Sequence, residues 1–260
     1  MDIWDGLCFK HDPDTSRRAF VFDMYGTLVR VGFGGPDSIF EAFRRLFPDA
    51  DPEDVRREYE RFMDSHDSVR REMSTAVMLE HMVSVFDTGN DILEAEDVMM
   101  RATHTFIPVE GAQDTLRYFR DRGYRIGVLT NTSYRGSVVK GLLEDAGFDR
   151  LIDAVVSSAD AGHRKPHGGA YDAVVTALGV RKKDCFFAGD DEEKDCLGPR
   201  RYGMRGSFLI DPSRPSRECG IVSSIVDIPA FFRDRSWGGN RFGAPGPYAG
   251  GTMVLIPPCG

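Results

Sequence analysis

The apolar run AFVFDMYGTLV, Ala19–Val29, is the feature that most restricts the fold of this chain. Aromatic and β-branched residues in a short block are typical of a buried strand, and Gly26 marks the bend that ends it. The acid in the run, Asp23, is then expected at the carboxyl end of the strand. Because ligands of open α/β sheets bind at that edge, Asp23 is a candidate nucleophile. The alternative is an Asp that only precedes a turn.

Beyond residue 107, short apolar runs alternate with helical patterns. Further strands are expected at residues 124–129, 154–156, 185–188 and 207–210, with one more strand and helix between 221 and 232. Between these runs, apolar residues recur at helical spacing, as at Val138, Leu142 and Leu143. Strands that alternate with helices indicate an α/β fold, in which a parallel sheet is covered by helices on both faces.

A helical segment separates the first strand from this alternation. Apolar residues recur on one face of about four helices between Asp37 and Phe106, and no strand pattern interrupts them. Pro52 suits the first turn of the second helix, and the glycine-rich residues 31–36 are expected to form a linker. The methionines of this segment are expected to pack in a core or to line a pocket: Met73, Met78, Met82, Met99 and Met100.

These patterns divide the chain into four parts. We expect a polar leader at residues 1–18, a catalytic core at 19–34 and 107–235, a helical insert at 35–106, and a tail rich in Gly and Pro at 236–260. The insert would leave the sheet after the first strand and return to it before the second.

The composition excludes some partners. Hydrophobic residues make up 41% of the chain and charged residues 28%, close to globular averages. The net charge of -8 argues against nucleic acid, whose binding needs an excess of Lys and Arg on one face. No apolar run is long enough to cross a membrane, and the first residues do not resemble a signal peptide. The five scattered cysteines are expected to be reduced thiols in a cytoplasmic protein. The sequence indicates no oligomeric state.

Polar residues follow four of the expected strands, at the same edge of the sheet. Besides Asp23, Thr130 offers a hydroxyl and Asn131 an amide to an anionic oxygen, although turn formation and helix capping are open alternatives. Lys165 lies in a loop whose backbone Pro166 would fix. A lysine there can neutralise crowded carboxylates or a phosphate, or it can simply be exposed.

The acidic stretch GDDEEKD, residues 189–195, follows an aromatic strand and opens a helix. Acids in the first turn of a helix are favoured by its dipole, which accounts for Glu192 and Glu193. It does not account for Asp190, which directly follows the glycine at the strand end and is expected beside Asp23. Two carboxylates in one site repel unless a cation bridges them, and Mg²⁺ prefers an all-oxygen shell.

The four stretches, in this order and at these separations, resemble the four motifs of the haloacid dehalogenase superfamily over about Phe20 to Phe232. The resemblance implies a Rossmann-like parallel sheet and makes the helical insert a cap domain that closes over the site. It implies that Asp23 forms a covalent aspartyl intermediate, that Thr130 is the hydroxyl of the second motif, and that Lys165 is the stabilising lysine.

The resemblance also implies a Mg²⁺ site. Its ligands would be the carboxylates of Asp23 and Asp190 and the backbone carbonyl of Tyr25, with Asp195 in support. The expected substrate-binding residues are Gly26, Thr27 and Asn131. The substrate would be a small phosphorylated molecule.

One position departs from the phosphatase pattern. Phosphatases of the superfamily usually carry a second Asp two residues after the nucleophile as general acid and base, and here that residue is Tyr25. A Tyr resembles the 2-haloacid dehalogenase branch, which needs no metal. Tyr171 also matches a tyrosine of that branch, although an aromatic residue at this position of a helix is common in packing. The stretch 189–195 instead resembles the metal-dependent phosphatases. The favoured interpretation is a Mg²⁺-dependent phosphate-ester hydrolase, and the alternatives are a 2-haloacid dehalogenase and a weakly active binding or regulatory protein.

Overall fold

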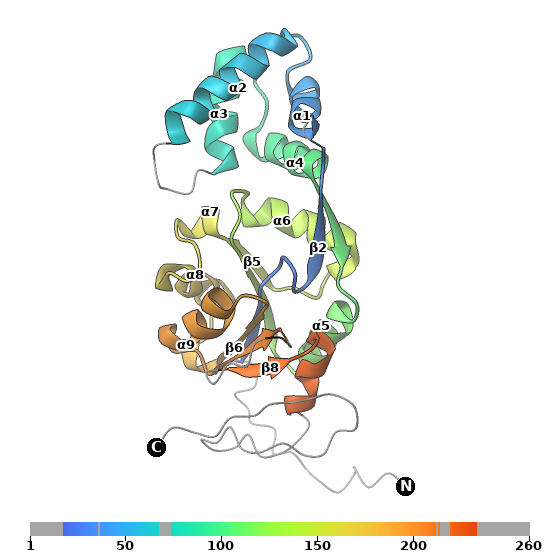
Figure 1. The fold of residues 1–260 in the computed structure, drawn as a ribbon, viewed down its shortest axis with the longest axis vertical. Coiled ribbons are helices and arrows are strands. Elements are labelled where there is room, and N and C mark those ends of the chain that lie inside the picture. Colours follow the sequence, from blue (N-terminus) through green and yellow to red (C-terminus); the bar gives the residue numbers. More distant parts are fainter. Residues whose placement is uncertain (1–17, 36, 68–73, 212, 214–218, 233–260) are drawn as a thin grey trace, which may run out of the picture.

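A six-stranded parallel sheet forms the centre of the computed structural model, which describes residues 18–35, 37–67, 74–211, 213 and 219–232 (Figure 1). The strands lie in the order β5-β4-β1-β6-β7-β8. Their bounds are Ala19–Phe22 for β1, Arg125–Thr130 for β4, Ala154–Ser157 for β5, Cys185–Gly189 for β6, Gly206–Ile210 for β7 and Gly220–Val222 for β8. Phe22 pairs with Val128 on one side and Ala188 on the other. The predicted parallel sheet is confirmed.

Alternate residues of β1 contribute to two hydrophobic cores, one on each face of the sheet. Phe20 and Phe22 pack with Phe119 of α5, whereas Val21 packs with Val174 of α8. This division follows from the two-residue period of a strand. The helices of this part are α5 (Ala112–Arg120), α6 (Gly136–Leu143), α7 (Ser158–Ala161), α8 (Gly168–Leu178) and α9 (Gly198–Tyr202), with π-helical η2 (Glu144–Phe148) and η4 (Glu192–Leu197) and 3₁₀-helical η3 (Lys182–Asp184) and η5 (Ile225–Phe232). Helices therefore cover both faces, as predicted.

Four further helices make up what we call the helical insert, residues 38–103. They are α1 (Ser38–Leu46), α2 (Pro52–Asp67), α3 (Thr75–Phe86) and α4 (Ile92–Thr103). Ser74 and Asp91 begin α3 and α4 because their side chains accept bonds from the first backbone N–H groups. The expected helices are present, and packing is confirmed for the methionines that the structure describes: Met78, Met82, Met99 and Met100 are buried. Met73 lies outside the described residues.

A two-stranded antiparallel ribbon joins the helical insert to the sheet (Figure 1). It consists of β2 (Val29–Phe33) and β3 (His104–Pro108). The predicted linker at 31–36 is therefore wrong for its first residues, and so is the prediction that no strand interrupts the helical pattern before Phe106. The glycines suggested a loop, but each strand exists because it pairs with the other, and the partners lie far apart in sequence.

Helix boundaries differ in places from the sequence expectations. The helix expected from Pro108 begins at Ala112, after Gly111 in the left-handed region. The short helix α7 was not predicted; Ser157 and Asp160 start it with reciprocal side-chain caps. In the described part of the chain, no helix is both long and apolar enough to span a bilayer. The expected leader and tail lie outside the described residues, apart from Arg18.

A disulfide joins Cys196 in η4 to Cys219 just before β8. The expectation that all cysteines are reduced is wrong for these two, while Cys185 is a buried free thiol. The 23-residue separation carries no local signal. Their Cα atoms come within 5.7 Å because β8 pairs with β7, and η4 also packs against β7. Cys8 and Cys259 lie outside the described residues.

Candidate active site

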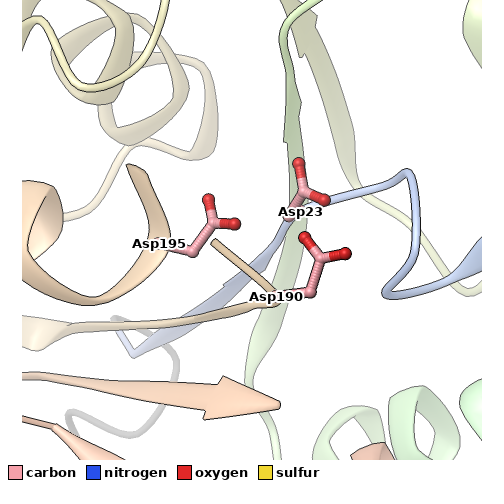
Figure 2. Close-up of side chains that lie close together, drawn as sticks. All are labelled: Asp23, Asp190 and Asp195. Carbon is pink, nitrogen blue, oxygen red and sulfur yellow. The ribbon is translucent and has the colours of Figure 1, made fainter. Parts of the chain in front are cut away.

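Three carboxylates meet at the carboxyl edge of the sheet. Asp23 follows β1, Asp190 follows the neighbouring strand β6, and Asp195 lies in η4 (Figure 2). The backbone N–H of Asp23 donates to the carbonyl of Ala188, 2.8 Å away, which extends the pairing of the two strands to the site. One oxygen from each carboxylate lies within 4.8 Å of the others. Adjacent parallel strands therefore bring together acids that are far apart in the sequence.

Two glycines permit this close approach. Gly26 has a φ of 78°, and a Cβ there would lie 2.1 Å from Oδ2 of Asp190. A Cβ on Gly189 would lie 2.3 Å from Oδ2 of Asp195. Cβ atoms are essentially never found within 3.0 Å of such atoms, so a side chain at either glycine would force the neighbouring carboxylate to shift. The glycines of the first and fourth motifs thus make room for the carboxylates.

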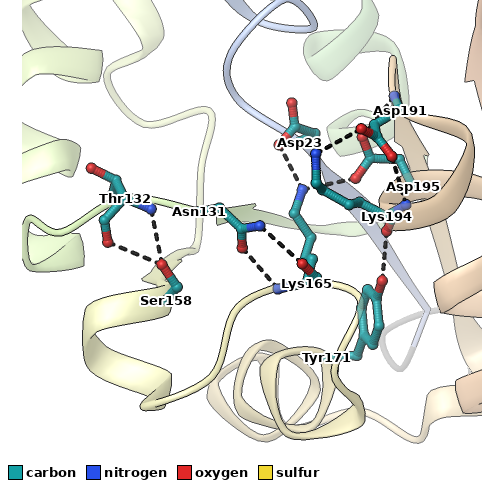
Figure 3. A network of polar contacts seen from close by, with 9 residues as sticks. All are labelled: Asp23, Asn131, Thr132, Ser158, Lys165, Tyr171, Asp191, Lys194 and Asp195. Atoms are coloured by element: carbon teal, nitrogen blue, oxygen red, sulfur yellow. Dashed lines mark hydrogen bonds and ion pairs between the residues drawn. The ribbon is translucent and has the colours of Figure 1, made fainter. Parts of the chain in front are cut away.

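Lys165 bridges two of the three acids. Its Nζ donates to Oδ1 of Asp23 at 2.6 Å and to Oδ1 of Asp195 at 2.8 Å, and its side chain is buried (Figure 3). Asn131 holds the backbone of the lysine with two bonds: Lys165 N donates to Oδ1 at 2.8 Å, and Nδ2 donates to the Lys165 carbonyl at 3.0 Å. Residues of all four predicted motifs therefore form one connected network.

The cluster carries more negative than positive charge when its acids are ionised. Burial raises the pKa of Asp23, although the charge of Lys165 opposes the shift. Burial, and then the charge of Asp195, raises the pKa of Asp190. Burial raises the pKa of Asp195 to about 6. Burial disfavours the ammonium of Lys165, but Asp23 and Asp195 outweigh it and raise the pKa of Lys165.

These residues fit a hard divalent cation. Oxygen ligands at this spacing suit such an ion, and it would compensate the charge that Lys165 leaves unbalanced. A bound cation would also reverse the upward pKa shifts, because it favours the ionised form of each carboxyl group.

Tyr25 lies where the strand turns toward the ribbon. Its hydroxyl is hydrogen-bonded to Thr132, and burial raises its pKa above the usual range of a phenol. Its ring packs edge-on against Phe106 of β3, with the ring centroids 6.1 Å apart. The phenol is therefore held between the sheet edge and the ribbon, and its raised pKa makes it a weak acid.

Two buried hydroxyl groups at this edge, Oγ1 of Thr27 and Oγ1 of Thr130, lack a hydrogen-bond partner among the described residues. Buried polar groups normally have partners, so both are available to a ligand. Among the other expected substrate-binding residues, Gly26 uses its N–H within the turn, donating to the carbonyl of Val29 at 2.9 Å. The side chain of Asn131 is occupied by Lys165.

Sequence reasoning missed two supports of the site. The hydroxyl of Tyr171 donates to the carbonyl of Lys194 at 2.6 Å, directly beneath the turn that carries Asp195 (Figure 3). Ser158 of α7 accepts a bond from the N–H of Thr132 and donates to its carbonyl. The ring of Tyr171 is buried, and nothing in the local sequence indicates either hydrogen bond.

A protein-family model described as haloacid dehalogenase-like hydrolase matches residues 17–203. The chain belongs to this family. This hydrolase is 39% identical over 119 residues to phosphatase MT3486 of Mycobacterium tuberculosis (strain CDC 1551 / Oshkosh), a match covering 46% of this chain and 53% of the relative. It is 29% identical over 152 residues to haloacid dehalogenase-like hydrolase domain-containing protein 3 of Homo sapiens, covering 57% and 59%. The matches thus span little more than half the length of these curated relatives.

Solved structures share the fold of this hydrolase. The L-2-haloacid dehalogenase RSc1362 superposes with a TM-score of 0.53 at 20% identity, covering 84% of this chain and 99% of that chain. A HAD phosphatase from Thermococcus onnurineus gives a TM-score of 0.51 at 16% identity, covering 83% and 98%. Phosphatases and dehalogenases thus occur on the same fold, and the site must distinguish them.

Proposed function

We propose that this hydrolase cleaves a small phosphate ester in a Mg²⁺-dependent reaction, with Asp23 as the nucleophile. The observation that carries the proposal is the cluster of Asp23, Asp190 and Asp195, with oxygens within 4.8 Å and a single lysine between two of them. The dehalogenases that the first motif resembles have Ser and Asn in place of the acids of the fourth motif. The phosphatase name of the Mycobacterium tuberculosis relative supports the same choice.

In the proposed reaction, a carboxylate oxygen of Asp23 attacks phosphorus and forms an aspartyl-phosphate. The bond between phosphorus and the ester oxygen breaks, and the alkoxide leaves and takes a proton from water. Water then attacks phosphorus, releases phosphate and restores the carboxylate. Lys165 keeps the Asp23 carboxylate in one orientation and offsets part of its charge. The unpaired hydroxyls of Thr130 and Thr27 would donate to phosphoryl oxygens. Phosphoryl transfer depends chiefly on such positioning and charge neutralisation.

Mg²⁺ would be held by the carboxylates of Asp23 and Asp190 and by the carbonyl of Tyr25, with Asp195 acting through Lys165. The ion would neutralise charge on the phosphoryl group. What this chain lacks is an acid beside the leaving oxygen, a contribution typically worth ~10²–10⁴-fold. The phenol of Tyr25 is a poor substitute, because its pKa is raised. We therefore expect a preference for esters with good leaving groups.

We further propose that the helical insert is a cap domain over this site. The proposed division is a leader at 1–18, a catalytic core at 19–34 and 107–235, a cap at 35–106 and a tail at 236–260. The ribbon β2–β3, which joins insert and sheet, supports it. A cap limits the substrate to a molecule that fits beneath it, and so the substrate class proposed is a small phosphorylated metabolite.

A 2-haloacid dehalogenase is the second candidate, because Tyr25 stands where that branch has a tyrosine. A panel of phosphate esters and L-2-haloacids, each with Mg²⁺ and with chelator, separates the two. We expect phosphate release that chelator abolishes and that Asp23→Asn lowers by about 10³-fold or more. Glu193→Gln, at an exposed acid of the same motif, is the control and should leave activity unchanged. Chloride release that persists without metal would refute the phosphatase.

A further inference from the structure

The loop that follows β4, residues 131–135, connects the site with the helical insert. Each of its side chains contacts a different segment of the molecule. Asn131 binds the backbone of Lys165, Thr132 binds Tyr25, Ser133 binds Thr75, Tyr134 binds Thr103, and Arg135 binds Glu96. The first two partners belong to the site, and the last three belong to α3 and α4 of the insert.

Contacts on the insert side combine backbone and side-chain bonds. Thr75 at the start of α3 donates its N–H to the carbonyl of Ser133 at 2.9 Å, and the two hydroxyls lie 2.8 Å apart. Glu96 of α4 accepts the backbone N–H of Arg135 at 2.7 Å on one oxygen and the Nε of Arg135 on the other. Both halves of the Glu96 carboxylate therefore bind the residue that begins α6.

The carboxylate of Glu96 is completely buried, whereas the side chain of Arg135 is 35% exposed. A buried ion pair gains little net energy, since desolvation of the charges offsets their attraction, but removing one partner leaves an uncompensated charge and is strongly unfavourable. Such a pair fixes a geometry more than it adds stability. Here the geometry is that of the insert on the loop.

The other end of the loop reaches the reacting group. Asn131 holds the backbone of Lys165 with two bonds, and Nζ of Lys165 holds the carboxylate of Asp23. A displacement of the loop therefore changes the position of the lysine that orients the nucleophile. We propose that Glu96 is a positioning residue. Its contacts with Arg135 fix how the helical insert packs on the 131–135 loop, and Asn131 of that loop fixes the position of Lys165. The consequence for turnover rests on the proposed function.

Hydrogen exchange of single backbone amides, measured by NMR on the metal-free protein, tests the coupling without substrate. The variant is Glu96→Gln, which removes the charge but keeps the size of the side chain. The matched control is Asp145→Asn, which breaks an exposed ion pair between Asp145 and Arg101 of α4, across the same two parts of the molecule. Arg101 keeps its bond to Asp97 in that control.

We expect Glu96→Gln to speed exchange at two amides. One is that of Arg135, because the glutamine has no charge and only one acceptor oxygen for the two N–H groups that Glu96 binds. The other is that of Lys165, which donates to Asn131. Gly127 in the middle of β4 should not change, and Asp145→Asn should change none of them. If exchange became faster at Arg135 alone, Glu96 would make only a local contact and the proposal would be overturned. The proposal would also fail if Asp145→Asn sped exchange at Lys165 as much as Glu96→Gln does.

A milder variant covers the case in which Glu96→Gln fails to fold. Ser133→Ala removes the hydroxyl contact with Thr75 but buries no charge and keeps the carbonyl that Thr75 N–H binds. It should raise exchange at Lys165 in the same way, by a smaller factor; no change there in a folded variant also overturns the proposal.

Turnover gives the second measurement. Glu96→Gln should lower kcat by about 3- to 30-fold, the range typical of mutations along a coupling network. KM should change less, because Glu96 touches no substrate. Asp145→Asn should change kcat by less than about 2-fold, as expected for an exposed ion pair. If no phosphate ester is hydrolysed but exchange at Lys165 still responds, the coupling stands and the proposed function fails.

Discussion

The backbone of Gly26 passes so close to Asp190 that a Cβ at Gly26 would lie 2.1 Å from Oδ2 of the carboxylate. The glycine of the first motif thus determines where the acid of the fourth motif can stand. The two residues follow the neighbouring strands β1 and β6, and the pairing of these strands brings them together.

Gly26→Ala should therefore displace Asp190 and raise the apparent dissociation constant for Mg²⁺ by about 10- to 100-fold. It also places Ala in the left-handed region, at a cost of roughly 1–2 kcal/mol in stability. Gly89→Ala separates the two effects, since Gly89 has a φ of 64° and nothing within 4 Å of a Cβ. Calorimetric titration with Mg²⁺ and thermal unfolding of both variants are the measurements. Equal Mg²⁺ affinity in the two would contradict the steric argument.

Tyr25→Asp should supply the missing acid and increase turnover of esters with poor alkoxide leaving groups by up to about 10²-fold. Activated aryl esters should gain little, because their leaving groups depart without a proton. Tyr25→Asn is the control: it loses the same contacts with Thr132 and Phe106 but cannot donate a carboxyl proton. The measurement is kcat for matched alkyl and aryl esters. If Asp and Asn variants behave alike on alkyl esters, the missing-acid account is wrong.

The stabilisation given by Mg²⁺ should grow with pH between about 5 and 7.5, because protons compete with the ion for carboxylates. Burial raises the pKa of Asp195 to about 6, and the pKa of Asp190 is also raised. An acid whose folded pKa exceeds its unfolded value loses stability as pH rises from the unfolded to the folded pKa. Mg²⁺ binds the ionised carboxylates, so it can restore this lost stability only at a pH at which Asp190 and Asp195 are ionised.

The measurement is the shift in Tm on adding Mg²⁺ at several pH values. Asp190→Asn should flatten the dependence as well as reduce the shift. A shift that is as large at pH 5 as at pH 7.5 would argue against carboxylate ligands.

Alkylation of the denatured, unreduced protein should leave Cys196 and Cys219 unmodified, as counted by mass spectrometry. Closing a loop of 23 residues should contribute about 3 kcal/mol to stability. Cys219→Ser should lower the free energy of unfolding by a similar amount, and a reductant should then have no further effect. Modification of all five cysteines without reductant would instead match the thiols expected of a cytoplasmic protein.

The sheet and the acids at its edge were predictable because each strand is a compact apolar block and each acid directly follows one. Asp23 and Asp190 were expected near each other because each follows a strand at the same edge of a parallel sheet, but the order of the strands is known only from the structure. The partners of the 131–135 loop could not, since Glu96 and Thr75 look like ordinary residues of amphipathic helices. Their roles depend on which helix face meets the loop, and that is a property of tertiary packing. The strands β2 and β3 escaped prediction for the same reason.

Pairing of β2 with β3 also has a consequence for how the protein can be altered. Phe33 lies opposite His104 in the ribbon, so the chain leaves for the insert and returns from it at neighbouring points. Everything between them is in principle an exchangeable module: a tight turn could close the ribbon, or a different bundle could be grafted there. Any replacement, however, has to present a carboxylate or another acceptor to Arg135. Without it, the start of α6 loses the hydrogen bonds that hold the 131–135 loop in place.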